Sequence, residues 1–226
     1  MELKIIARIR NGYREKFGIP RQSGLAPVLS RIVFEKEYRD INAVRGLEGF
    51  SHLWLIWGFS ANEGRQTEAF RPTVRPPVLG GNERVGVFAT RSPFRPNPVG
   101  LSSVQLNQVI ETSEGPVLEV LGADLMDGTP IYDIKPYLPR FDSHADARCG
   151  FTEDHEFRTL EVSFAEDVAD LIPESEREAL KQALSQDPRP QYQDDPQRIY
   201  GMKYADLDIR FKVCGNELVV IEVLKD

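Results

Sequence analysis

The chain has 226 residues, 41% of them hydrophobic, and a formal net charge of −7 at pH 7. That size allows one large domain, or a main domain with a smaller appendage. The sequence contains no apolar run long enough for a membrane-spanning helix and no signal-peptide core, and its two cysteines make no disulfide framework. We therefore expect a cytoplasmic protein without a membrane partner, and the acidity at first argues against nucleic-acid binding.

The charge is divided unevenly along the chain. Residues 1–140 carry 18 basic and 15 acidic side chains, whereas residues 141–226 carry 10 and 20. The acidity therefore belongs to the C-terminal third, and residues 71–100 hold five arginines and one acidic residue, Glu83. Guanidinium groups bind phosphate or carboxylate and stack on bases, although a solvated face with internal ion pairs accounts for the charge equally well. The five are Arg71, Arg75, Arg84, Arg91 and Arg95.

The first 140 residues show strand patterns separated by turns. Alternation predicts a strand at 2–10, prolines bracket an ordered loop at 19–27, and aromatic and β-branched residues predict a buried strand at 51–59. Many short strands without a long helical pattern predict a mainly β fold, either a barrel or a sandwich. Further strands are expected at 84–90, 99–111, 116–124 and 131–134.

The last third has a different pattern. Residues 141–158 are polar and lack a period, which predicts a linker or mobile loop between a domain at 1–140 and a second at 159–226. The second domain is expected to be a small α+β unit. Its predicted elements are a strand at 159–164, a helix that starts at Pro173 and stops before Asp187, and a hairpin of strands 207–213 and 217–224.

Several common motifs are absent from the sequence. It lacks the glycine-rich dinucleotide and P-loop patterns and the paired histidines of zincins, which also excludes the common Rossmann-type methyltransferases. His144, Cys149 and His155 lie close in sequence, but a zinc site usually has four ligands at tighter, paired spacing, so we interpret them as part of a flexible polar loop and expect no metal. Neither cysteine has an activating neighbour, and His52, at the start of an apolar strand, is interpreted as a core histidine.

The segment 84–102 combines a short strand with a proline-fixed loop. The prolines restrict the backbone, so ordering this loop costs little entropy. Arg91, Phe94, Arg95 and Asn97 stand on it. A purely structural corner would not need two arginines, so we interpret the loop as preorganised for recognition.

Two carboxylates, Asp124 and Asp127, flank the end of the strand expected at 116–124. Paired carboxylates serve acid–base chemistry, or bind a metal, a ribose or an amine. Asp-Gly turn chemistry explains Asp127 well, whereas Asp124, expected still on the strand, is less easily explained by a turn.

The sequence also contains a set of ordered motifs: RGLEGFSHLW at 45–54, RPTVRPP at 71–77, GVFATRSPFRPNP at 86–98, DGTP at 127–130, DIKPY at 133–137 and DPRPQY at 187–192. Taken together, these motifs resemble those of the TsaA/TrmO family of S-adenosylmethionine-dependent tRNA methyltransferases. The resemblance implies an N-terminal barrel that binds S-adenosylmethionine, a homodimer, and methylation of the exocyclic amine of threonylcarbamoyladenosine in the tRNA anticodon loop.

The resemblance also implies site residues. Asp124 and Asp127 suit stabilisation of a sulfonium, and Arg91 and Arg95 suit the carboxylates of cofactor and substrate. The expected catalytic residues are Arg91, Asp124 and Asp127. Cofactor contacts are expected from Arg21, Gln22, Ser23, Gly24 and Leu25, from Arg91, Ser92 and Phe94, and from Asp124, Leu125, Met126, Asp127 and Gly128. Contacts with tRNA are expected from Arg71, Arg75, Arg95, Asn97, Lys135 and Tyr137.

Two other functions fit the sequence less well. One is a non-enzymatic barrel that binds a nucleotide-like ligand, and the other is a metal-dependent hydrolase built on Asp124, Asp127 and the His/Cys loop. Methylation assays with labelled S-adenosylmethionine distinguish all three.

Overall fold

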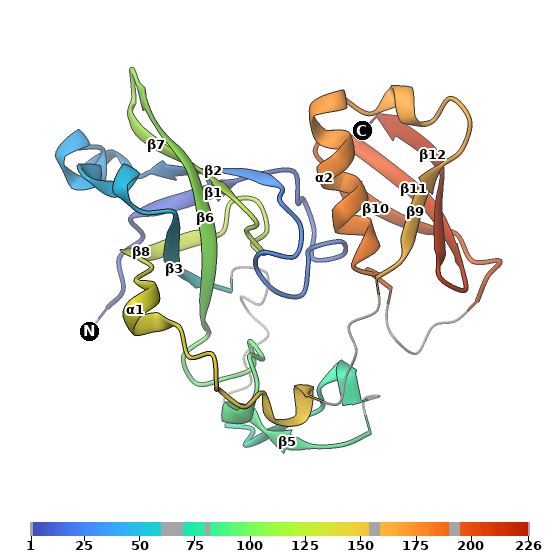
Figure 1. Cartoon of the computed structure of the whole chain (residues 1–226), viewed down its shortest axis with the longest axis horizontal. Helices are drawn as coiled ribbons and strands as arrows, with labels where there is room; N and C mark the ends of the chain where they lie inside the picture. Colours follow the sequence, from blue (N-terminus) through green and yellow to red (C-terminus); the bar gives the residue numbers. More distant parts are fainter. Residues whose placement is uncertain (1, 60–69, 80–81, 154–158, 190–194, 226) are drawn as a thin grey trace.

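The structure, a computed structural model, describes residues 2–59, 70–79, 82–153, 159–189 and 195–225. It consists of a closed β-barrel and a C-terminal unit of one sheet and one helix (Figure 1). This confirms the mainly β class with a C-terminal α+β unit. None of the described helices combines the length and hydropathy needed to span a bilayer.

The barrel has six antiparallel strands in the order β1-β2-β7-β6-β3-β8, and β1 closes it by pairing with β8. Alternate residues of each strand point inward, so one apolar face per strand fills the interior. On β6 the buried positions are Gly100, Ser102, Val104 and Leu106. The strands are β1 (Ala7–Arg10), β2 (Leu29–Phe34), β3 (His52–Gly58), β6 (Val99–Thr112), β7 (Gly115–Leu121) and β8 (Pro130–Pro136).

Short elements connect these strands. The strand expected at 84–90 is wrong for most of its length, because β5 (Val85–Gly86) pairs only with the two residues of β4 (Thr73–Val74). Prolines flank β4 and cannot donate to a sheet ladder, which limits this pair. The other connections are η1 (Lys36–Tyr38), η2 (Ile41–Val44), η3 (Leu47–Gly49), η5 (Pro77–Leu79), η6 (Val87–Ala89), α1 (Pro139–Asp142), η7 (Gly150–Thr152) and η8 (Ala169–Leu171).

The C-terminal unit is a four-stranded sheet in the order β10-β11-β12-β9, in which β9 runs parallel to β12. The helix α2 (Glu174–Ser185) lies where the sequence predicted a helix and buries Leu180, Ala183 and Leu184 in the same core as the sheet. The strands are β9 (Glu161–Phe164), β10 (Tyr200–Tyr204), β11 (Leu207–Cys214) and β12 (Glu217–Lys225). Residues 154–158 of the predicted linker lie outside the described residues.

Residues 11–28, between β1 and β2, join the barrel to the C-terminal unit. Tyr13 forms an isolated antiparallel bridge with Tyr204, and the amide of Ala205 donates to the carbonyl of Gly12 over 2.7 Å. Phe17 stacks on Phe211 with ring centroids 6.3 Å apart. Burial raises the pKa of both Tyr13 and Tyr204. The segment thus belongs by chain order to the barrel and by packing to the C-terminal core.

We call residues 11–28 the junction, and substitution of Gly18 tests how closely it packs against the C-terminal unit. Gly18 has φ +92°, and a Cβ there would lie 2.7 Å from Cγ of Met202 and overlap its sulfur. Gly46, with φ +87°, has no atom within 4 Å of such a Cβ, so Gly46→Ala reports backbone strain alone. We expect Gly18→Ala to lower the free energy of unfolding by about 1–3 kcal/mol more than Gly46→Ala, measured by urea denaturation. Equal losses would show that the junction tolerates displacement.

Candidate functional site

Three loops meet at the end of the barrel where β3 and β7 finish. The amide of Gly24 donates to the carbonyl of Gly122 over 2.8 Å, and a Cβ on Gly122 would lie 3.1 Å from Cα of Gly24. Both glycines have positive φ, a conformation that other residues rarely adopt. Arg91 brings in the third loop by donating a hydrogen bond to the side chain of Gln22. The loops expected at residues 21–25, 91–94 and 124–128 are therefore assembled at one place.

A hydrogen-bonded chain of side chains runs from the barrel interior to Asp124. The indole N–H of Trp57 donates to the hydroxyl of Ser102 over 3.0 Å, and Ser102 Oγ lies 2.5 Å from Asp124 Oδ1. An indole nitrogen can only donate, so the hydroxyl proton of Ser102 must point to the carboxylate. A Cβ at Gly100 would overlap the ring of Trp57, so this glycine gives the indole its place.

Asp124 is a largely buried carboxylate whose pKa is raised. Burial is the largest cause, because it penalises the charged form. The hydrogen bond from Ser102, backbone hydrogen bonds that include one from Ser23, and the guanidinium of Arg91 act in the opposite direction without cancelling it. A carboxylate in this state readily accepts a proton or pairs with a cationic ligand. Its place differs from the prediction, because β7 ends at Leu121 and Asp124 stands in the following loop.

Asp127 points to a different set of partners. Its carboxylate lies 3.6 Å from Arg10 and 3.3 Å from Arg14, and it accepts the amide hydrogen of Asn11 over 3.1 Å. Arg14 also reaches Asp206 of the C-terminal unit over 3.4 Å. Asp127 thus connects β1, its own turn and the junction. Since Asp124 and Asp127 have different partners, the structure does not assemble them as a carboxylate pair.

The other residues of the turn at 124–128 contact the barrel or other residues of the turn. The side chain of Leu125 lies in the barrel core, so only its backbone is available to a ligand. Gly128 donates its amide to Ile9, and the carbonyl of Met126 accepts from Thr129. Within the turn, Asp124 is therefore the residue directed to the loops at 21–25 and 91–94.

The arginines that were predicted to bind cofactor or tRNA have different partners in the structure. Arg95 donates from Nη2 to the carbonyls of Thr90 (2.8 Å) and Val87 (3.2 Å), which places it as a clamp within its own loop. Arg71 and Arg75 are exposed and form no ion pair with any described residue. Arg21 reaches the carbonyl of Asp187 in the C-terminal unit over 3.4 Å. Asn97 is exposed.

Lys135 and Tyr137 lie near the opposite end of β8. Lys135 pairs with Asp133 over 2.8 Å, and the ring of Tyr137 lies 5.4 Å from that of Trp54. The seven residues of β8 span about 20 Å, so these two are not brought to Asp124. His52, near Tyr137, is exposed, so the interpretation as a core histidine is wrong, because the strand begins at the barrel rim.

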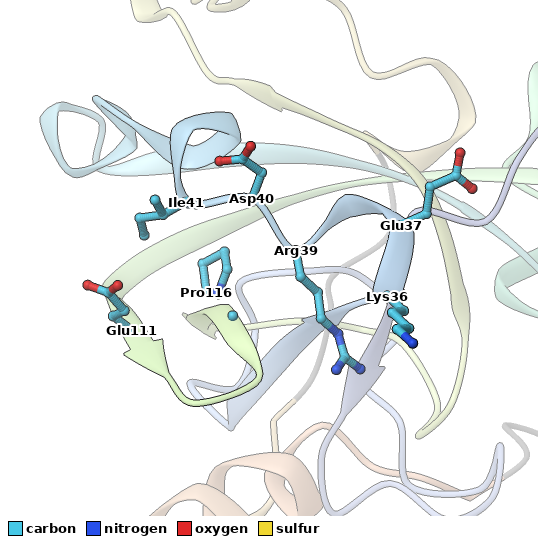
Figure 2. Close-up of a pocket in the computed structure, with 8 residues that line it drawn as sticks. Lys36, Glu37, Arg39, Asp40, Ile41, Glu111 and Pro116 are labelled. Carbon is cyan, nitrogen blue, oxygen red and sulfur yellow. The ribbon is translucent and has the colours of Figure 1, made fainter.

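A surface cleft of about 530 Å³ lies at that same far end, between η1, the start of η2 and the β6–β7 hairpin (Figure 2). Its lining alternates in charge and includes Lys36, Glu37, Asp40 and Glu111. Arg39, also in the lining, already donates to the carbonyl of Phe34 and to Glu114. No convergent set of groups resembles the one at Asp124, so we place the functional site at the three loops.

The sequence interpretation did not single out Ser102 and Trp57 as site residues. A signal existed for Ser102, since it occupies an inward position of a strand whose other inward residues are Gly100, Val104 and Leu106. A buried hydroxyl needs a partner, and the partner is Asp124. Nothing in the spacing of Trp57 distinguishes its N–H from that of any other core tryptophan.

A closed barrel that carries a partly buried carboxylate beneath three joined loops differs from the Rossmann-type architecture of the common methyltransferases. Residues 8–143 match the family model described as the tRNA-methyltransferase O N-terminal domain, and residues 158–226 match the TrmO C-terminal domain. The chain belongs to this methyltransferase family, which confirms the resemblance seen in the sequence.

Relatives and solved structures agree with this membership. The chain is 40% identical over 229 residues to the tRNA (adenine(37)-N6)-methyltransferase of Escherichia coli (strain K12), covering 96% of each. It is 40% identical over 223 residues to a putative S-adenosylmethionine-dependent methyltransferase, RcsF, of Pseudomonas aeruginosa, covering 95% of this chain and 93% of the relative. A crystal structure of TrmO from Pseudomonas aeruginosa superimposes with a TM-score of 0.78 at 33% identity, covering 99% of this chain and 98% of that one.

Amide substitutions separate the two aspartates by stability. Asp124→Asn removes a charge that burial disfavours, so the melting temperature at neutral pH should stay the same or rise. Asp127→Asn removes the charge that faces Arg10 and Arg14, and we expect a loss of about 1 kcal/mol, since both arginines are half exposed. Scanning calorimetry measures both. A clear loss of stability in Asp124→Asn would contradict this assignment.

Proposed function

We propose that the chain transfers the methyl group of S-adenosylmethionine to the exocyclic N6 of threonylcarbamoyladenosine at position 37 of tRNA. The observation that carries the proposal is the convergence of three loops on the buried carboxylate of Asp124. The Escherichia coli relative, a tRNA (adenine(37)-N6)-methyltransferase, supports the reaction, and the Pseudomonas relative, a putative S-adenosylmethionine-dependent methyltransferase, supports the donor.

The groups at the three loops suit S-adenosylmethionine. That molecule carries a carboxylate, an ammonium, a cationic sulfonium and an adenine. Asp124 offers a negative charge, Arg91 a positive one, and Leu25 and Phe94 offer exposed apolar surface. The backbone of Ser23 and Gly24 borders the same place. When bound, the cofactor supplies an electrophilic methyl group.

The residues of the chain then have separate roles in the reaction. Asp124 takes up the proton that N6 loses as it becomes methylated, and Ser102 keeps the accepting oxygen in place. Arg91 binds a carboxylate, since it donates to the neutral amide of Gln22 and forms no ion pair with the residues that the structure describes, whereas Arg95 already serves the backbone of its loop. Positioning of donor and acceptor supplies the rest of the acceleration, and no covalent intermediate on the protein is needed.

We also propose that the enzyme works in the cytoplasm as a homodimer and binds the anticodon loop of its tRNA. Arg91, beside the Asp124 site, is exposed, and we propose that the second copy completes the site from the side of this residue. The arginine-rich stretch at 71–100 supplies the positive charge that tRNA requires.

Ser102→Ala should change the pH dependence of methyl transfer. The activity should rise with pH as Asp124 ionises, with a midpoint above the pKa of an ordinary aspartate. Loss of the hydroxyl removes a hydrogen bond that favours the charged form, so the acid limb should move to higher pH and the rate at a fixed pH on that limb should fall several-fold. Ser103→Ala, on the outward face of β6, is the matched control. An unchanged acid limb in Ser102→Ala would argue against Asp124 as proton acceptor.

The reaction itself is tested with purified protein, methyl-labelled S-adenosylmethionine and two tRNA preparations. One carries the threonylcarbamoyl group and the other lacks it, and nucleosides are separated after digestion. We expect label only in the modified nucleoside of the first tRNA. Label in neither tRNA would rule out the proposed function, and equal label in both would rule out the proposed substrate.

A further inference from the structure

Three phenylalanines lie exposed on the segment that carries β4, β5 and the recognition loop. Phe70, Phe88 and Phe94 expose 57%, 73% and 55% of their surface. The rings of Phe70 and Phe88 are stacked, with centroids 6.1 Å apart and planes inclined by 23°. We call these three residues the aromatic platform. Figure 1 shows its segment below the barrel, away from the C-terminal unit.

The platform does not stand on a loose loop. Thr90 accepts the amide of Ser92 over 3.2 Å, and Ser92 accepts the amide of Phe94 over 3.2 Å. The guanidinium of Arg95 holds the carbonyls of Val87 and Thr90. These bonds fix the turn between Phe88 and Phe94, so the exposed rings are presented by an ordered backbone and lose little freedom when a ligand stacks on them.

The segment that carries these rings is rich in positive charge. Glu83 is the one acidic residue among positions 71–100, against five arginines. Arg71 and Arg75 adjoin β4, are exposed, and pair with none of the residues that the structure describes. Flat apolar rings on an arginine-rich segment are a combination that binds single-stranded nucleic acid, with bases on the rings and phosphates on the arginines.

A second copy of the chain is the other candidate occupant. A two-fold contact through the same surface would bring the arginines of both copies together, and such like-charge contacts are unfavourable. An RNA strand provides the opposite charge. The platform also shares its loop with Arg91, which contacts Gln22 at the functional site. The platform is therefore close in sequence to the site where methylation is proposed.

We propose that the aromatic platform stacks unpaired bases of the anticodon loop beside the methylated nucleotide. This inference rests on the proposed function, because it gives the RNA substrate a binding surface. Phe88 has no part in the proposed cofactor site or in proton transfer, so its loss should weaken RNA binding while methyl transfer at saturating tRNA persists. Phe94 also borders the proposed cofactor site, so its loss is read by RNA affinity alone.

The test measures the affinity of the full chain for a fluorescent anticodon stem–loop by anisotropy over a series of salt concentrations. Phe88→Ala and Phe94→Ala should each weaken binding at least about fivefold and leave the slope of log K against log salt unchanged. Arg75→Gln should instead reduce the slope by about 0.7, as expected for one lost phosphate contact with a single strand. Phe88→Trp should restore binding, and Phe141→Ala, an exposed phenylalanine on α1, is the matched control.

Stacking itself is read from 2-aminopurine placed in the loop, whose fluorescence should be quenched by the wild-type chain and less by the alanine variants. Unchanged affinity and quenching in both alanine variants would overturn the platform. A shift from dimer to monomer in light scattering without a loss of RNA affinity would also overturn it, in favour of a protein interface. In either case label transfer by the wild-type chain continues, whereas failure of the proposed function removes that transfer as well.

Discussion

The segment between β1 and β2 has to satisfy two hydrophobic cores at once. Its first residues continue a barrel strand, its aromatic residues pack into the C-terminal sheet, and its last residues return to the barrel at Val28. The loop at 21–25 lies inside this segment and meets Gly122 across a contact that leaves no space for a side chain. The site therefore depends on the packing of the C-terminal unit, although the described hydrogen-bond partners of Asp124 come from the barrel and its loops.

Within this arrangement, the carboxylate of Asp124 has an unfavourable electrostatic environment. A buried carboxylate is unfavourable unless it is well paired, and here the surrounding hydrogen bonds offset the cost only in part. Trp57 and Ser102 hold the carboxylate of Asp124 in place from inside the barrel, where the paired strands limit the movement of both side chains. Asp127, three residues later, is stabilised by two arginines and anchors the turn. One short loop thus carries a carboxylate whose pKa is raised and one that is held in ion pairs.

The order of the elements and the three site loops could be predicted from the sequence. Alternation and turn residues revealed β3, β6, β7, β8 and the final hairpin, because their patterns are local. The pattern at 84–90 misled, since β-branched residues near Val85 found only a two-residue partner between prolines. The different environments of Asp124 and Asp127 could not be predicted from the sequence. Asp127 is held in ion pairs because Arg10 of β1 and Arg14 of the junction reach it in the folded chain.

The sequence by itself determined the family, the charge asymmetry and the identity of the loops, because these depend on residue types and spacing along the chain. Tertiary structure decided which side chains meet. It directed Arg95 to its own backbone, left Arg71 and Arg75 exposed, and separated Lys135 and Tyr137 from Asp124 by the length of a strand. It also brought Ser102 to Asp124, since strand pairing and barrel closure set distances between residues that are remote in sequence.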